Sequence, residues 1–415
     1  MKVLITGANY NNKGAQSMLF VAADEIRKSF PDCEILFATK ETIDSSNLRL
    51  QPVFYTYEIQ NAILGKLSFL SKAKKNVKQI IKFVLRRSKK FTYEGYIKSI
   101  ETRISDVDVI LDVSGLALSD KQSYDYNEWY LNHIRIAKKF NIPIYLMPQS
   151  FGPFEYDGLE EKEVLLSEIK ELLQYPRIIF PREQEGYDFL EKSFGLHNLV
   201  LSTDTVLQNS GVNLKGVFKS EVKLNVHVLD TENNVAVIPN SKCFDRIEAE
   251  TLLSMYDRLI RKLLLNGKTV YVFRHAGEDL NICKQIKNRF GEEGRVILLE
   301  RDFSCLEYDE FVKNFDFIIC SRYHGIVHAF RNGIPAIALG WAIKYKELLH
   351  NTGQDKYEFD ITSKEFDVND VETALDRMLE EYKQESKCIK EKVSQIQQVN
   401  CYDLVVRDYK ALSVN

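Results

Sequence analysis

Short apolar runs recur along the chain and alternate with segments in which apolar residues fall at helical spacing. Each run is four to seven residues long, which suits a strand that is buried on both faces. Eleven strands are predicted: Lys2–Gly7, Glu34–Lys40, Val107–Val113, Pro143–Met147, Ile178–Pro181, Leu199–Ser202, Val235–Pro239, Thr269–Phe273, Val296–Leu299, Phe315–Cys320 and Pro335–Leu339.

Helical patterns lie between these strands. The predicted helices include Gly14–Phe30, Asn127–Phe140, Leu159–Leu173, Glu248–Leu265, Asp279–Arg289 and His324–Asn332. Buried strands joined by helical crossovers indicate an α/β protein with doubly wound parallel sheets.

A polar, turn-rich stretch from Gln208 to Gly216 interrupts the alternation and predicts a hinge. We therefore expect a Rossmann-like domain over residues 1–208, a second one over residues 209–366, and a cleft between them. Residues 367–415 are charged and helical in pattern. We expect them to form helices that pack back toward the N-terminal domain.

Composition narrows the functional classes. The chain has 415 residues, 45% of them hydrophobic and 28% charged, with a formal net charge of −3. These values suit a two-domain globular protein and argue against a nucleic-acid partner bound through overall charge. No apolar run is long enough to span a bilayer, and the start is not typical of a signal peptide. Seven widely spaced cysteines without Cys-x-x-Cys predict no disulfide framework and a cytoplasmic location.

One segment departs from this balanced charge. No acidic residue occurs between Glu58 and Glu94, and apolar residues there recur on one helix face, which predicts a basic amphipathic helix over about residues 60–90. Such a helix can bind an anionic membrane surface, or it can pack on its own domain with a solvated basic face. Its basic residues are Lys66, Lys72, Lys74, Lys75, Lys78, Lys82, Arg86, Arg87, Lys89 and Lys90.

Candidate chemistry is sought where strands end, because ligands of doubly wound sheets bind beyond the carboxyl ends of the strands. The first strand leads into the loop Gly7–Gln16, which is neither a P-loop nor a Gly-x-Gly-x-x-Gly turn. Its backbone N–H groups can still favour an anion at the start of the next helix. A plain strand-to-helix turn explains the loop equally well.

The segment Ser321–Gly325 carries the sharpest signal, because it joins a buried strand directly to a helix. Arg322 can bind a phosphate or carboxylate, the N–H groups of Tyr323 and His324 favour the same anion, and His324 can move a proton near neutral pH. The alternative without a function is that Ser321 caps the helix, Arg322 lies on the surface, and His324 has its hydrogen bonds satisfied within the protein. His328 lies one turn after His324, but no third ligand is near, so no metal site is predicted. His275 follows another strand, and its position suits lining of the cleft and a catalytic role equally well.

Together these motifs resemble the polysaccharide pyruvyl transferases, whose fold is similar to that of two-domain GT-B glycosyltransferases. The resemblance runs from the Asn11–Ala15 loop to about Leu348. It departs at Asp112–Gly115, where many members have a run of glycines, and it does not include the basic helix. The segments that carry it are Asn11–Ala15, Pro148–Pro153, Arg182-Glu183 with Asp204, Ser321–Gly325, Gly333-Ile334-Pro335 and Lys344.

The resemblance implies transfer of pyruvate from phosphoenolpyruvate onto two hydroxyls of a sugar, forming a cyclic ketal and releasing phosphate, without a cofactor. It implies His324 and Arg322 as catalytic residues. The expected donor-binding residues are Arg182, Arg322, Tyr323, His324, Lys344 and His275.

The acceptor is expected against the N-terminal half of the chain. Its expected contacts are Asn11, Asn12, Lys13, Gly14, Ser114, Gly115, Gln149 and Ser150. An undecaprenyl-diphosphate-linked bacterial sugar would place the enzyme in the cytoplasm, peripherally at the inner face of the membrane. The basic helix, with Lys66–Lys90, would then dock it beside its substrate.

Two other functions remain open at this point. A nucleotide-sugar glycosyltransferase would have the same architecture, and Glu292 and Glu300 have the seven-residue gap of some retaining members. We interpret that gap as chance, because Glu292 lies in a predicted turn and Glu300 ends a strand. A glycan-binding assembly protein with an inactive site is the third alternative, and intact Arg182, Arg322 and His324 argue against it.

Overall fold

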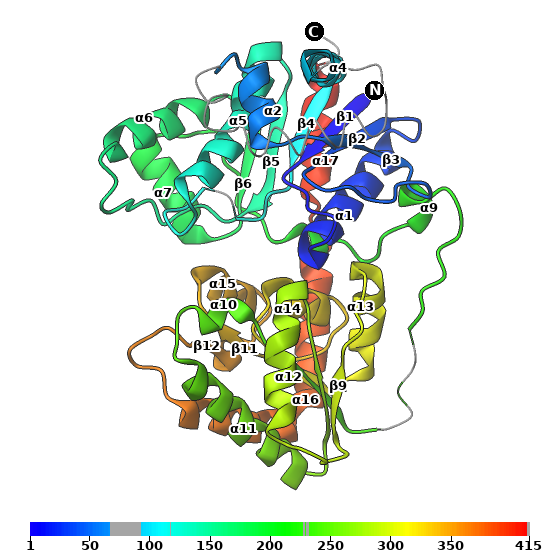
Figure 1. Cartoon of the computed structure of the whole chain (residues 1–415), viewed down its shortest axis with the longest axis vertical. Coiled ribbons are helices and arrows are strands. Elements are labelled where there is room, and N and C mark those ends of the chain that lie inside the picture. The colour runs from blue at the N-terminus through cyan, green and yellow to red at the C-terminus, as the bar shows by residue number, and fades with distance from the viewer. Residues whose placement is uncertain (67–92, 117, 227–228, 230–231, 413–415) are drawn as a thin grey trace.

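A computed structural model describes residues 1–66, 93–116, 118–226, 229 and 232–412. Two six-stranded sheets, each parallel throughout, lie in separate halves of the molecule with helices on both faces (Figure 1). This arrangement confirms the predicted α/β class with two Rossmann-like, doubly wound domains.

The first sheet is built from the N-terminal half and has the order β3-β2-β1-β4-β5-β6. Its interior strands are buried on both faces, which explains their continuous apolar character. The strands are β1 (Lys2–Thr6), β2 (Glu34–Thr39), β3 (Leu50–Phe54), β4 (Val109–Asp112), β5 (Ile144–Gln149) and β6 (Ile178–Pro181). The helices that accompany them are α1 (Lys13–Ser29), α2 (Tyr57–Ile63), α4 (Tyr93–Ser105), α5 (Tyr124–Phe140), α6 (Lys162–Leu172) and α7 (Gln184–Phe194).

The second sheet has the order β12-β11-β10-β7-β8-β9. Its strands are β7 (Asn234–Ile238), β8 (Thr269–Phe273), β9 (Val296–Leu299), β10 (Phe317–Cys320), β11 (Ala336–Gly340) and β12 (Glu358–Asp360). The helices of four or more residues in and before this half are α8 (Thr205–Gln208), α9 (Leu214–Val217), α10 (Ser241–Phe244), α11 (Ala249–Leu265), α12 (Leu280–Asn288), α13 (Cys305–Phe311), α14 (Tyr323–Arg331) and α15 (Ile343–Asn351).

Both sheets share one topology, because in each the first strand of the domain lies between the second and the fourth. The strand order therefore reverses between β1 and β4 in one sheet and between β7 and β10 in the other. Ligands of open α/β sheets bind at such reversal points. The loops after these strands are consequently the places to look for a site.

Two helices complete the chain. The long α16 (Val368–Ile396) packs on the second domain, and α17 (Cys401–Leu412) returns to pack on α1 and β5 of the first (Figure 1). Asp408 on α17 accepts hydrogen bonds from Arg177 (2.8 and 3.0 Å) and from the Tyr145 hydroxyl (2.6 Å). The domain boundary at residues 208/209 stays a prediction.

Three details of the predicted strands differ from the structure. The edge strands β3 and β12 were not predicted, and Leu199–Ser202 forms only an isolated bridge, through Leu199, to Ile179. The predicted basic helix lies, from residue 67 to residue 90, outside the described part of the chain, while α2 covers its first few positions. None of the described helices combines the length and apolarity that a membrane crossing needs.

Candidate active site between the two domains

The N-termini of α1 and α14 meet where the two reversal points face each other. A Cβ atom added to Gly14, in the first turn of α1, would lie 2.2 Å from Nδ1 of His324, in the first turn of α14. Only a residue without a side chain allows this approach. The structure therefore brings the predicted Gly14 and His324 into direct contact across the domain boundary.

Asp204 joins residues from both domains at one carboxylate. Its Oδ2 atom accepts a hydrogen bond from Arg182 Nη1 at 2.6 Å and lies 3.4 Å from His324 Nε2. Its Oδ1 atom caps α8 by accepting the Val206 N–H at 2.9 Å. Burial alone would raise the pKa of the Asp204 carboxyl, but His324 and Arg182 outweigh that effect and hold the pKa well below its ordinary value.

Arg182 is the buried partner of this carboxylate. Its Nη2 atom donates to the Gly115 carbonyl and to Ser150 Oγ, both at 2.8 Å, and its guanidinium lies 4.7 Å from the centre of the Tyr323 ring. The Nε atom has no hydrogen-bond partner among the described residues. Arg182 therefore brings Gly115, Ser150 and Tyr323 together with Asp204, beside which His324 also lies. Five of the predicted site residues thus form one cluster with Asp204.

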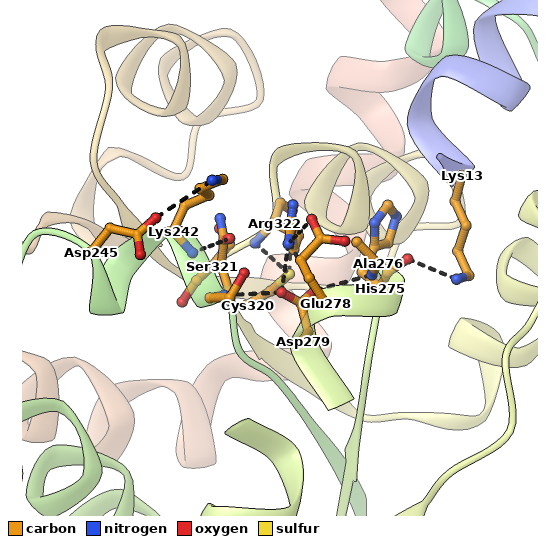
Figure 2. A network of polar contacts seen from close by, with 12 residues as sticks. Lys13, Lys242, Asp245, His275, Ala276, Glu278, Asp279, Cys320, Ser321 and Arg322 are labelled. Carbon is orange, nitrogen blue, oxygen red and sulfur yellow. Dashed lines mark hydrogen bonds and ion pairs between the residues drawn. The ribbon is translucent and has the colours of Figure 1, made fainter. Parts of the chain in front are cut away.

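Arg322 is held separately, on the side of the second domain. It donates to both carboxylate oxygens of Asp279 (2.8 and 2.5 Å) and to Glu278 (2.8 Å), as Figure 2 shows. Its Nη1 atom makes no hydrogen bond to the described part of the chain. The structure thus does not place Arg322 in the Asp204 cluster, although it immediately precedes Tyr323 and His324.

Lys13 and His275 meet through the backbone rather than through the imidazole. Lys13 reaches from α1 to the second domain, where its Nζ donates to the His275 carbonyl at 2.7 Å (Figure 2). The same Nζ donates to Asp302 at 2.5 Å. The His275 ring is buried edge-on to Tyr308. Burial lowers the pKa of His275 well below its ordinary value, so the ring is neutral and suits packing better than anion binding.

Lys344 lies at the start of α15, 5.2 Å from the centre of the Tyr323 ring and 5.5 Å from that of Trp341. Burial lowers its pKa to about 8, and the Arg182 charge acts in the same direction. Lys344 lines both a hollow of about 10 Å³ beside Arg182 and Asp204 and a hollow of about 750 Å³ on its other side. It is therefore the wall between the two.

The remaining predicted acceptor residues support the loops. Asn12 caps α1 by accepting the N–H groups of Gly14 (3.1 Å) and Ala15 (3.2 Å), while Asn11 binds Glu41 (2.6 Å). Gln149 donates to the Met147 carbonyl at 3.1 Å. A Cβ on Gly7 would lie 2.2 Å from Ser114 Oγ, so the loops after β1 and β4 touch. The Gln149 carbonyl accepts the backbone N–H of Arg182 at 3.1 Å and so touches the Asp204 cluster, whereas Asn11 has no contact with that cluster among the described residues.

Sequence reasoning missed a buried pair beneath these loops. Asp112 ends β4 and accepts hydrogen bonds from Thr6 (2.6 Å), from the Ser114 N–H (3.1 Å) and from His133 Nδ1 (2.9 Å). An aspartate at the end of an apolar strand can be recognised in the sequence. That His133 on α5 is its partner follows only from the fold. The pair orients the Ser114–Gly115 turn on which Arg182 rests.

His328 has a structural role. It lies 2.7 Å from Asp309 through Nδ1 and 2.8 Å from Ser17 Oγ through Nε2, so it links α14 to α1. Among the described residues, no three His, Cys, Asp or Glu side chains are placed to hold a metal ion.

Comparisons with known proteins agree with this architecture. No curated protein matches the chain. Among solved structures, the UDP-GlcNAc 2-epimerase of Neisseria meningitidis bound to UDP-GlcNAc superposes with a TM-score of 0.56 at 12% identity, covering 100% of both chains. The UDP-GlcNAc 2-epimerase of Methanocaldococcus jannaschii gives 0.55 at 13% identity, covering 91% of this chain and 93% of that one. These likenesses show a GT-B-like fold and nothing more.

The family comparison covers the site itself. A sequence model described as polysaccharide pyruvyl transferase matches residues 12–342, a span that holds Gly14, Arg182, Asp204, Arg322 and His324. Lys344 lies just beyond the matched span. The chain therefore belongs to the polysaccharide pyruvyl transferase family.

Proposed function

We propose that this transferase moves pyruvate from phosphoenolpyruvate onto two hydroxyls of a sugar and forms a cyclic ketal. The observation that carries the proposal is the junction of α1 and α14, where His324 lies between Gly14 and Asp204 beside Arg182. This junction brings together a proton-transfer group, a helix N-terminus and the guanidinium of Arg182. Such a combination suits a small dianion.

Donor binding requires rearrangement, because the hollow beside Arg182 and Asp204 measures only about 10 Å³. We propose that the donor's oxyanions take over the guanidinium contacts that carboxylates now make. Arg322 is the first candidate, since Glu278 is 53% exposed and free to turn away. A phosphate and a carboxylate can each accept the paired N–H groups of an arginine.

The chemistry follows from the donor. A proton adds to the methylene carbon of phosphoenolpyruvate, an acceptor hydroxyl oxygen bonds to C2, and the bond from C2 to the phosphate oxygen breaks. The second hydroxyl oxygen then closes the ring. Of the two hydroxyl protons released, one balances the new methyl group and the other leaves with phosphate. We assign the proton transfer to His324, which Asp204 orients, and the anion contacts to Arg182 and Arg322.

The acceptor's linkage and the place of reaction are further proposals. An undecaprenyl-diphosphate-linked sugar would bring the enzyme to the cytoplasmic face of a membrane, with the basic segment Lys66–Lys90 as the contact. Charge reversal of Lys75, Lys78 and Lys82 should then weaken co-sedimentation with anionic vesicles. Unchanged sedimentation would refute the membrane contact and leave the transfer reaction unaffected.

Phosphate release tests the donor. Wild-type protein with phosphoenolpyruvate and a panel of galactosides, glucosides and mannosamine derivatives should release phosphate only when an acceptor is present. Arg322→Gln should raise KM for phosphoenolpyruvate, while Arg261→Gln, which removes a surface ion pair with Asp257, should not. Turnover of UDP-sugars instead of phosphoenolpyruvate would decide for a nucleotide-sugar glycosyltransferase.

A further inference from the structure

A hollow of about 750 Å³ lies beyond Lys344, and residues of α7 and α15 are among those that line it. These two helices belong to different domains (Figure 1). Loops of both domains line it, and its volume falls within the roughly 300–1,000 Å³ of typical ligand pockets. The aromatic residues Phe151, Phe154, Phe189 and Trp341 are among those that line it. Nothing in the family match assigns a ligand to this hollow.

A second hollow, of about 410 Å³, adjoins the first, because Lys121 and Glu155 line both. Its wall is more polar and includes Asp120, Gln122 and Tyr124. The Tyr124 side chain is 44% exposed. The Asp120 side chain is only 8% exposed, yet its Oδ1 atom makes no hydrogen bond to the described residues and has Lys121 at 3.5 Å as its ion-pair partner.

The wall of the second hollow therefore offers carboxylate and amide groups to a ligand that carries hydroxyls. Aromatic rings with a few charged groups suit the two faces of a sugar ring, whose C–H groups are apolar and whose hydroxyls are not.

The charges select among possible occupants. The basic Lys121, Arg246 and Lys344 are balanced by acidic side chains in the two walls, namely Asp120, Glu155, Asp157 and Glu185. Mixed signs disfavour a polyanion such as a nucleic acid, and the polar second hollow disfavours a hydrocarbon tail. Hydroxyl-rich, nearly neutral ligands fit both hollows.

We propose that the two hollows form one binding track for an oligosaccharide acceptor at least two sugar units long. The reacting sugar lies at the Ser150 and Lys344 end, against the Asp204 cluster. The next unit lies past Lys121 and Glu155, on Tyr124 and Asp120. The acceptor class follows from the proposed transfer to a glycan, on which this inference rests.

Equilibrium binding without phosphoenolpyruvate tests the track apart from the reaction. Manno-, gluco- and galacto-oligosaccharides of one to four units are titrated into the full chain by calorimetry. In at least one series, Kd should fall about tenfold from one unit to two or three, which corresponds to about 1.4 kcal/mol. Tyr124→Ala should abolish this gain and leave the single-unit Kd unchanged, whereas Trp341→Ala should weaken both.

Tyr187→Ala on α7, which lines neither hollow, is the control and should bind as wild type. The protein has two tryptophans, Trp129 and Trp341. In the variant Trp129→Phe all tryptophan fluorescence comes from Trp341, and we expect this fluorescence to change when sugar binds. Equal Kd for all lengths, binding insensitive to Tyr124→Ala, or no binding by any series would overturn the track. If the protein binds longer sugars more tightly but never releases phosphate from phosphoenolpyruvate, the binding track stands and the proposed donor is refuted.

Discussion

At the scale of single residues, the site depends on His324, which contacts groups from two other elements. Gly14 of α1 leaves room for the ring, and Asp204 at the start of α8 holds Nε2 from the other side. The His324 side chain is 15% exposed, so an imidazole oriented by a carboxylate still has access to a substrate. This is the arrangement that proton transfer requires.

Replacing His324 should remove the chemistry and keep the fold. We expect His324→Ala to lower kcat by about 10²–10⁴-fold with unchanged circular dichroism and melting temperature. His350→Ala, an exposed histidine paired with Asp355, is the matched control and should retain full activity. Turnover close to wild type in His324→Ala would remove this residue from the mechanism.

Gly14→Ala tests the close approach of the two helices. Alanine favours a helix more than glycine does, so propensity alone predicts a slight stabilisation. The added Cβ would instead collide with the His324 ring at 2.2 Å and displace it, and we expect kcat to fall about 10–100-fold. Gly294→Ala, where the added atom meets nothing within 4 Å, should leave kcat unchanged. Equal rates in both variants would mean that the ring can shift without consequence.

Lys344 should leave a signature in the pH dependence of stability. Burial lowers its pKa from 10.5 to about 8, so between these values the unfolded chain binds a proton that the folded chain has lost. The contribution of Lys344 to the free energy of unfolding is therefore least favourable below pH 8 and rises with pH across this window.

Lys344→Met should abolish that rise, measured as the difference between the variant and wild type in urea unfolding at about pH 7.5 and about pH 10. Lys346→Met, on the exposed side of α15, is the control. An identical pH dependence in Lys344→Met and wild type would show that the ammonium is not buried in the folded protein.

At the scale of elements, α1 holds the two domains together. Lys13 binds Asp302 and the His275 carbonyl, Gln16 accepts the Cys305 N–H at 2.9 Å, and Ser17 contacts His328. All three side chains leave the first turns of one helix and reach the other domain. The helix that approaches His324 is therefore also one that links the two domains.

Lys13→Met should weaken this connection. The Lys13 side chain is 4% exposed and loses two charge-assisted hydrogen bonds, so we expect a loss of about 1–3 kcal/mol in the free energy of unfolding. Hydrogen exchange should rise in the loop around Asp302. Lys284→Met, which breaks a surface pair with Glu300, should cost less than about 1 kcal/mol. Equal effects of the two substitutions would show that Lys13 is no special link.

The errors in the predicted elements lie at the edges of the sheets. Interior strands such as β1, β7 and β10 have continuous apolar runs because helices cover both faces, and periodicity identifies them. The edge strand β3 contains Pro52, which an edge tolerates and a pattern search penalises, and β12 has three residues. Leu199–Ser202 has an apolar beginning but bonds to β6 only locally.

At the scale of the whole molecule, the site forms where two domains of the same topology face each other. The sequence identifies the loops after the strands, since their positions follow from the doubly wound pattern. It does not identify Asp279 as the partner of Arg322, or Gly14 as the neighbour of His324. Those contacts depend on how loops and domains pack. Asp279 and Arg322, for example, are 43 residues apart in the sequence, and local spacing does not predict that they meet.

The most direct test of the central claim is mass spectrometry of an acceptor oligosaccharide after incubation with phosphoenolpyruvate in deuterated water. We predict a mass gain of one pyruvate less one water, with one deuteron in the new methyl group, and a product yield with His324→Ala that is lowered in step with its kcat. An unmodified acceptor across the whole panel, or a ketal whose methyl group carries no solvent deuteron, would contradict the account.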